Sequence, residues 1–399
     1  MLRPNTVALT LLLSLLIGVA PMSVDMYLAS LPDIGRSLRA SDAQVQLTLS
    51  FFLIGFAVGQ VIYGPLSDRH GRRPVLLAAL FVFTLASVVC ALSPTIEILI
   101  AARLVQAVGG AGTVVLARTV VRDVYEGALV ARELSRMAAV MALAPLVGPM
   151  IGGVLQTFFG WRSNFMVLIG LGVVAAALVG LMLQETLRVR APEPVSLASI
   201  IRSYRRFLGN RAFIAYLGIT VCTFGGLFAW ISGSAFVLQN LYGLTALAFG
   251  IMFAIGSAGY LIGTWFAAFI VPRIGLDRTL GFGCIAMAAG GIACLLALSL
   301  FASSALALVL SVALFLAGLG LALPQAQAGA LLPFPDRAGA ASSLLGFCQQ
   351  TAGAVVGAIV VLLLGQSAWP LAAAMAVMGI GALVLWALTR SVRSTQSRG

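Results

Sequence analysis

The sequence predicts an all-α integral membrane protein with twelve transmembrane helices in two pseudo-symmetric bundles of six. Of 399 residues, 61% are hydrophobic and only 9% are charged, and the mean hydropathy is +1.08. A soluble domain needs more polar surface than this, whereas apolar runs of about 20 residues are long enough to cross a bilayer. The basic residues lie almost entirely between these runs. Composition and charge placement therefore indicate the same class.

Twelve apolar runs are separated by polar segments. The first run continues beyond Pro21 and lacks a convincing cleavage site, so we expect a retained membrane helix rather than a signal peptide. The expected helices span residues 6–31, 44–66, 74–93, 96–118, 134–155, 163–183, 212–237, 246–271, 279–301, 304–328, 339–364 and 368–389.

The arginines predict the orientation. All 24 basic residues are arginine, and with a cytoplasmic N-terminus twenty of them fall on the cytoplasmic side. Three fall on the outer side (Arg36, Arg39 and Arg162), and Arg103 lies within the membrane. Because arginine concentrates on the cytoplasmic side of membrane proteins, we expect both termini there. The net charge of +12 then needs no nucleic-acid partner.

The longest polar connection divides the chain into two halves. We expect an N-terminal bundle at 1–185, a cytoplasmic linker at 186–211 and a C-terminal bundle at 212–399. The linker carries six arginines that can hold it against anionic lipid headgroups. Arg69-x-Gly71 in the first half recurs as Arg273-x-Gly275 in the second, which is typical of transporters built from parallel repeats.

Several classes of function are disfavoured. The chain has no lysine, so it lacks a phosphate-binding Gly-Lys-Ser/Thr loop and cannot itself drive ATP-dependent pumping. His70 is the only histidine, and the five cysteines lie within apolar runs without metal-ligand spacing. We expect no metal, no cofactor and no catalytic residues, so the chain is not predicted to be an enzyme.

Small residues form a stripe on the fifth predicted helix. Pro145, Gly148, Pro149, Gly152 and Gly153 are spaced i, i+3, i+4, i+7 and i+8, which places them on one face. A face without bulky side chains lets another helix approach closely, and neighbouring helices can satisfy carbonyls freed by the prolines. The pattern predicts a close helix contact.

A glycine-bounded charged string follows the second predicted helix. It reads Gly64-Pro-Leu-Ser-Asp-Arg-His-Gly-Arg-Arg73. We expect Gly64 to allow a close helix approach and Gly71 to form a tight turn. The string places Asp68 among Arg69, Arg72 and Arg73.

Two charged residues are predicted inside the membrane. Asp25 lies six residues before the outer end of the first helix, and Arg103 lies seven residues after the outer start of the fourth. At ~1.5 Å per residue both lie ~10 Å below the outer surface. Burial favours the protonated acid, and a nearby cation favours the carboxylate. We expect this balance to make Asp25 and Arg103 the proton-coupling pair.

These motifs resemble those of the major facilitator superfamily. The charged string resembles its loop motif, and Arg103-x-x-Gln106 with Gly109-Gly110 resembles its fourth-helix motif, whose arginine is implicated in proton transfer. The stripe is similar to the antiporter motif of the drug-exporting branch, although an upstream glycine is missing. The resemblance implies that Asp123 pairs with an arginine of the string. The implied residues for conformational gating are Gly64, Asp68, Arg69, Gly71, Arg72, Arg73, Asp123, Pro145, Gly148, Pro149, Gly152 and Gly153.

Four further segments resemble one subfamily, the bicyclomycin-resistance (Bcr/CflA) drug:proton antiporters. Ala29 stands where that subfamily usually has proline, so we expect a softer bend in the first helix. The segments are 21–28 with Leu31-Pro32, Gly160-Trp161-Arg162, 338–343 and 367–370.

Aromatic residues and methionines are candidates to line a substrate cavity between the halves. Such linings suit bulky, partly apolar compounds. Two small-residue faces, Gly55-xxx-Gly59 and Gly353-xxx-Gly357, are expected to meet between the halves. The candidate substrate-binding residues are Asp25, Tyr27, Met137, Met141, Phe224, Phe228, Trp230, Phe253 and Gln349.

The sequence therefore predicts a monomeric, proton-coupled antiporter of the bacterial inner membrane, surrounded by lipid. On family grounds its expected cargoes are drugs and similar amphiphilic molecules, such as bicyclomycin, phenicols and sulfonamides, exported by alternating access. An exporter of one metabolite, such as an amino acid, is the main alternative. Proton-driven uptake fits the antiporter-like stripe less well, and a passive channel would not need Asp25 paired in depth with Arg103.

Overall fold

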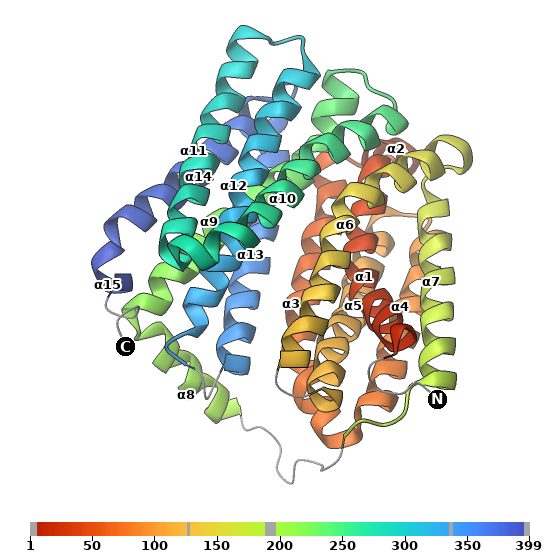
Figure 1. Ribbon diagram of the computed structural model, residues 1–399. Coiled ribbons are helices and arrows are strands. Elements are labelled where there is room, and N and C mark those ends of the chain that lie inside the picture. Colours follow the sequence, from red (N-terminus) through yellow and green to blue (C-terminus); the bar gives the residue numbers. More distant parts are fainter. Residues whose placement is uncertain (1–5, 126–127, 188–196, 335–337, 395–399) are drawn as a thin grey trace. The chain divides into compact units, whose positions relative to one another are not determined.

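The computed structural model describes residues 6–125, 128–187, 197–334 and 338–394, and these residues are almost entirely helical (Figure 1). None of the residues in these four ranges lies in a β-strand. Eleven helices of this part are long and apolar enough to cross a membrane, and Leu143–Phe159 adds a shorter apolar stretch. The all-α membrane class and its twelve apolar helices are confirmed. The chain divides into two compact units, Met1–Val195 and Ser196–Gly399.

Several helices of both units begin at a polar residue that caps them. Ser41 and Gln44 form a reciprocal capping box, and Thr95, Asn210 and Thr245 accept backbone N–H groups of the first turn. The first unit contains α1 (Val7–Asp25), η1 (Met26–Ser30), α2 (Leu31–Leu38), α3 (Asp42–His70), α4 (Arg72–Leu92), α5 (Ile96–Val124), α6 (Ala128–Phe159) and α7 (Arg162–Met182). The second contains α8 (Leu197–Leu208), α9 (Arg211–Ala235), η2 (Phe236–Leu241), α10 (Ala246–Ile274), α11 (Leu276–Leu300), α12 (Ala305–Leu331), α13 (Ala338–Leu364), α14 (Trp369–Leu388) and α15 (Arg390–Ser394).

The first predicted helix is not one continuous α-helix. It tightens into the 3₁₀ segment η1 directly after Asp25 and continues as α2 to Leu38. Pro32 has no N–H to donate to the Leu28 carbonyl, which instead accepts the N–H of Leu31, three residues along. The prediction of a single helix over 6–31 was therefore wrong at its C-terminal end.

The same tight turn joins the second and third membrane helices of each unit. Gly71 connects α3 to α4 with φ of 102°, and Gly275 connects α10 to α11 with φ of 84°. Such positive φ values favour glycine because it has no Cβ. The Arg-x-Gly repeat predicted from the sequence therefore corresponds to a repeated turn.

Two glycine faces pack inside their own units. A methyl group at Gly55 would lie 2.3 Å from the Leu104 carbonyl oxygen, and one at Gly59 would lie 2.6 Å from Ala111, so both face α5. A methyl group at Gly353 would lie 3.0 Å from Phe228 of α9. For Gly55 and Gly59 the prediction of a contact between the halves was wrong, because α5 of the same unit already covers this face. Gly353 likewise faces α9 of its own unit.

An ion pair between a buried arginine and a partly exposed aspartate connects the segment after α14 to the start of α11. The Arg393 Nε atom lies 2.7 Å from Asp277 Oδ1, and the Arg393 side chain is fully buried. Its Nη2 donates to the Trp386 carbonyl at 2.7 Å, and the Trp386 indole donates to the Asp277 carbonyl at 3.1 Å. The segment after α14 is thus fixed to the first turn of α11.

Candidate functional site in the first unit

Asp25 lies where α6 crosses closest to the first helix. The residue is only 4% exposed and is the last residue of α1. A methyl group at Gly148 would lie 2.6 Å from the Asp25 Cβ, and one at Gly152 would lie 1.8 Å from the Met26 carbonyl oxygen. We call this contact, together with its continuation along both helices, the α1–α6 seam. At the acid it has no room for an additional carbon atom.

The stripe of small residues faces this seam, as predicted. Gly148, Pro149, Gly152 and Gly153 are buried, and Pro145 is half-buried. The intervening side chains are exposed on the opposite side of α6: Val147, Met150, Ile151 and Val154. The predicted close helix contact is confirmed, and its partner is the segment that carries Asp25.

Arg103 is completely buried beside the same helix, but it does not pair with Asp25. Its Nη1 donates to the Ser23 carbonyl at 3.0 Å and to Gln106 Oε1 at 2.6 Å. Gln106 in turn donates to Ser87 Oγ at 2.7 Å. No hydrogen bond or ion pair between Asp25 and Arg103 occurs in the described ranges. Arg103 therefore fixes the backbone two residues before the acid.

Aromatic rings surround the Arg103 guanidinium. Its Cζ lies 4.3 Å from the ring centre of Phe52 and 4.5 Å from that of Tyr27. A desolvated cation–π contact of this kind contributes roughly 2 kcal/mol. Thr48 donates to the Val45 carbonyl, so its oxygen accepts from the Tyr27 hydroxyl. Tyr27, a predicted substrate contact, thus lies inside this cation cage and is fully buried.

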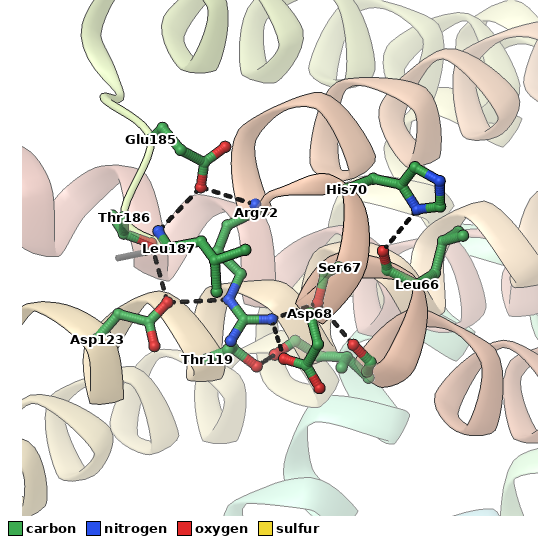
Figure 2. Close-up of polar contacts among 12 residues, drawn as sticks. Leu66, Ser67, Asp68, His70, Arg72, Thr119, Asp123, Glu185, Thr186 and Leu187 are labelled. Carbon is green, nitrogen blue, oxygen red and sulfur yellow. Dashed lines mark hydrogen bonds and ion pairs between the residues drawn. The ribbon is translucent and has the colours of Figure 1, made fainter. Parts of the chain in front are cut away.

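The charged string folds into a polar cluster at the α3–α4 turn (Figure 2). Arg72, whose side chain is 8% exposed, pairs with Asp68 and lies 2.9 Å from Asp123 Oδ2. It also donates to Ser67 Oγ at 2.7 Å. The predicted pairing of Asp123 with an arginine of the string is confirmed, and that arginine is Arg72. We call Ser67, Asp68, Arg72, Asp123, Glu185 and Thr186 the α3–α4 polar cluster.

Other residues of the string have different surroundings. Arg69 is exposed, whereas Arg73 donates to the Gly180 carbonyl at 2.5 Å. Gly71 forms the predicted turn. No atom of the first unit lies within 4 Å of a methyl group at Gly64, so the close helix approach predicted there is not found in this unit.

Glu185 joins the cluster from the segment after α7 (Figure 2). Its carboxylate accepts the backbone N–H groups of Arg72 at 2.8 Å and Arg73 at 3.2 Å, at the start of α4. Thr186 donates to Asp123 Oδ2 at 3.0 Å. Desolvation raises the pKa of Glu185, but N–H groups of Leu187, Arg72 and Arg73 outweigh it, and the net pKa is lowered.

The remaining substrate-binding candidates lie in several places. In the first unit, Met137 is 1% exposed in an apolar cluster, and Met141 packs against that cluster. In the second unit, the rings of Phe224 and Phe228 lie 4.8 Å apart, and Trp230 stacks on Phe253 at 5.7 Å. Gln349 accepts from Gln327 at 2.8 Å. Their role in binding substrate stays a prediction.

Two acidic residues of the first unit were missed by sequence reasoning. Glu185 follows the sixth helix closely, and this position beside an arginine-rich segment was the available signal. Glu133 was overlooked because it lies just before the predicted start of the fifth helix, at 134. In the structure α6 begins earlier, and Glu133 is buried within it. The error in the helix boundary thus hid a buried acid.

Two helical units with a buried acid on a close helix seam and a charged turn define a multi-pass membrane protein of the transporter class. A family model described as Major Facilitator Superfamily matches residues 13–358. The chain belongs to the Major Facilitator Superfamily, whose members are transporters and not in general enzymes.

Similar proteins agree with this assignment. The chain is 30% identical to multidrug resistance protein D of Escherichia coli, with 97% of this chain and 96% of that protein covered. It is 31% identical to a bicyclomycin resistance protein homolog of Haemophilus influenzae, with 100% and 99% covered. A crystal structure of a D-xylose–proton symporter matches its fold with a TM-score of 0.70 at 16% identity, covering 94% of this chain and 97% of that one.

Proposed function

We propose that this chain is a proton-coupled antiporter that exports drugs and similar amphiphilic molecules by alternating access. The observation that carries the proposal is the seating of Asp25 in the α1–α6 seam, against Gly148 and Gly152. The names of full-length relatives, which include multidrug and bicyclomycin resistance proteins, support the class of cargo. The cargoes to be tested first are bicyclomycin and chloramphenicol.

The seam gives Asp25 a way to act on α6. A carboxyl in the membrane gains or loses a full charge when a proton leaves or binds, and an uncompensated charge there costs about 2.5–3.5 kcal/mol on insertion scales. Arg103 fixes the Ser23 carbonyl on one side of the acid, and Gly152 touches the Met26 carbonyl on the other. Because Arg103 fixes the Ser23 carbonyl while α6 only packs against Asp25 and Met26, we expect a change in charge at Asp25 to be relieved by movement of α6 at the seam.

Replacement of Asp25 tests the proposal. Asp25→Asn keeps the size of the side chain and removes its titration, so we expect overproducing cells to lose resistance to the exported drug. Proton-driven drug uptake into inside-out vesicles should disappear at equal protein levels. Glu97→Gln, which replaces an exposed acid in the first turn of α5, is the matched control and should keep both activities. Full transport by Asp25→Asn would refute the proposal.

We also propose that the protein acts as a monomer in the bacterial inner membrane, with both termini in the cytoplasm. The excess of arginine in the segments that would face the cytoplasm supports this orientation. Alkaline phosphatase fused after Gly243, between η2 and α10, should be active, and the same enzyme fused after Thr389 should be inactive. The opposite pattern of activities would show that both termini lie on the outer side.

Light scattering of the detergent complex tests the proposal that the protein is a monomer.

A further inference from the structure

A chain of buried polar side chains runs through the first unit from α4 to the end of α1. Arg103 of α5 donates to the Ser23 carbonyl of α1 and to Gln106, and Gln106 donates to Ser87 Oγ of α4. All four residues are 0% exposed. We call Ser87, Gln106 and Arg103 the α4–α1 bridge.

The arginine determines the direction of every hydrogen bond in the bridge. A guanidinium has only donors, so the Gln106 atom beside it is the amide oxygen, and the amide nitrogen is left to donate to Ser87. The Ser87 hydroxyl in turn donates to the Phe83 carbonyl at 2.7 Å. The bridge thus ends on the backbone of α4, and reversing any of its bonds would leave a buried polar atom unpaired.

A glycine brings α4 and α5 close enough for the bridge to form. A methyl group at Gly109 would lie 2.5 Å from the Phe83 nitrogen and 2.7 Å from the Ala79 carbonyl oxygen. Gln106 lies about one turn before this glycine on α5, and Ser87 lies about one turn after Phe83 on α4. Because the two backbones touch at Gly109, the amide of Gln106 can reach the hydroxyl of Ser87.

At its other end the bridge caps α1. This helix ends at Asp25, where the chain tightens into η1. The last carbonyls of an α-helix are left to side chains or to the tighter bonds of a following 3₁₀ turn. Arg103 donates to one of them, the Ser23 carbonyl, and its positive charge interacts favourably with the negative end of the helix dipole. The cap therefore acts directly beside the acid.

Gln106 sets the orientation of the guanidinium. Arg103 Nε and Nη2 are buried and have no hydrogen-bond partner among the residues that the structure describes. The rings of Phe52 and Tyr27 attract the cation, but attraction to a ring face does not select which nitrogen points toward α1. The bond from Nη1 to Gln106, at 2.6 Å, supplies this selection.

We propose that Gln106 and Ser87 are positioning residues of the proton site, which hold Arg103 against the end of α1 and so keep Asp25 in the α1–α6 seam. The inference rests on the proposed function and extends the site to α4. In this role Arg103 acts on Asp25 through the backbone of α1, which agrees with the lack of a direct pair between them in the described ranges.

Two transport assays separate positioning from packing. Proton-driven drug uptake into inside-out vesicles requires Asp25 to bind and release a proton, whereas drug counterflow at equal pH on both sides requires only an intact transporter. Gln106→Leu keeps the size of the side chain and removes both of its bonds. We expect proton-driven uptake to fall roughly tenfold at equal protein levels, with little change in counterflow. Equal losses in the two assays, or no loss in either, would overturn the proposal.

Variants along the bridge test whether its members act together. Ser87→Ala removes the acceptor of Gln106 and should cause a smaller loss of the same kind. Because both residues act through Arg103, Ser87→Ala should add little to Gln106→Leu, and fully additive losses would contradict a single chain. Thr113→Val is the matched control, since this buried hydroxyl donates only to the Gly110 carbonyl of its own helix in the described contacts. It should match the parent.

A measurement without drug keeps this inference apart from the function on which it rests. Hydrogen–deuterium exchange in lipid nanodiscs, followed by mass spectrometry, reports how firmly η1 is held. In Gln106→Leu we expect the amides of Met26–Ser30 to exchange several-fold faster than in the parent, and Thr113→Val should leave them unchanged. Parent-like exchange in Gln106→Leu would refute the positioning role. If Asp25→Asn transports normally while Gln106→Leu loosens η1, only the proposed function fails.

Discussion

At Gly152 a single hydrogen atom faces the carbonyl oxygen of Met26. The 1.8 Å that would separate a methyl group from this oxygen is far inside van der Waals contact, and the opposing atom belongs to the backbone. A flexible side chain cannot turn aside to make room. The glycine therefore sets how closely α6 can approach the residue that follows Asp25.

We expect Gly152→Ala to move α6 away from η1. Overpacking of this kind costs about 1–3 kcal/mol, so the melting temperature in detergent should fall and drug export should be lost. Gly170→Ala on α7 is the matched control, because nothing lies within 4 Å of a methyl group there. Wild-type export by Gly152→Ala would show that the close contact is not needed for transport.

The sequence predicted that Asp25 and Arg103 lie inside the membrane, but not which groups they contact. Counting residues from a helix end gives depth and leaves the rotation of the helix about its axis undetermined. In the structure, Arg103 binds the Ser23 carbonyl and the Tyr27 ring, which lie one turn apart on the same side of the first helix. Asp25 lies between these residues in sequence and faces α6 instead.

At the scale of the helix, the start of α4 is capped by a residue more than a hundred positions away. Gly71 has no side chain to offer the first N–H groups of α4, and no side chain of the preceding turn caps them. Glu185 takes this place with its carboxylate, where a negative charge also interacts favourably with the helix dipole. The cap connects the segment after α7 to the charged turn.

Glu185→Gln should weaken this cap by removing its charge while keeping an acceptor oxygen. Because the pKa of Glu185 is lowered from 4.5, its ionisation stabilises the folded state above pH 4.5, and this stabilisation is lost as the pH falls through the lowered value. We expect a melting temperature about 1–4 °C below the parent at neutral pH. The difference should shrink below pH 4.5.

Thermal melts over a pH series in detergent measure this effect. Glu97→Gln removes an exposed acid from the first turn of α5 and controls for charge at a helix N-terminus without the long-range contact. An equal, pH-independent loss in both variants would show that Glu185 acts only as a general surface charge.

Patterns within one helix were predicted better than contacts between helices. The spacing of Gly148 and Gly152 predicted a close contact because helical periodicity places them on one face. Gly55 and Gly59 gave the same signal, yet their partner was assigned wrongly, since a small-residue face does not encode which helix will cover it. The 3₁₀ segment after Asp25 was also missed, because its cause is the missing N–H of Pro32, several residues further along.

At the scale of the whole molecule, each unit contains its own packed helices. In the first, α4 and α5 touch so closely that a methyl group at Gly109 would lie 2.5 Å from the Phe83 nitrogen. In the second, a methyl group at Gly290 would lie 2.4 Å from the Phe315 nitrogen, between α11 and α12. Because each unit packs its helices against one another, we expect the two units to fold even when they are made as separate polypeptides.

A divided gene tests this expectation. With the chain cut between residues 188 and 196 and both pieces co-expressed, we expect drug resistance above the level of the empty vector. A cut between residues 93 and 95 separates α4 from α5 inside the first unit and should abolish resistance. Equal resistance from the two divided genes would show that the units on either side of residues 195 and 196 do not assemble independently of each other.

The long-range hydrogen bonds of Glu185 and Arg393 also determine the order in which contacts can form during translation. Glu185 reaches back 113 positions to Arg72, and Arg393 reaches back 116 positions to Asp277. At about 5–20 residues per second, a ribosome needs roughly 6–23 s to make each intervening stretch. Neither tie can form before this interval has passed, so α4 and α11 are each made well before the residue that binds their first turn.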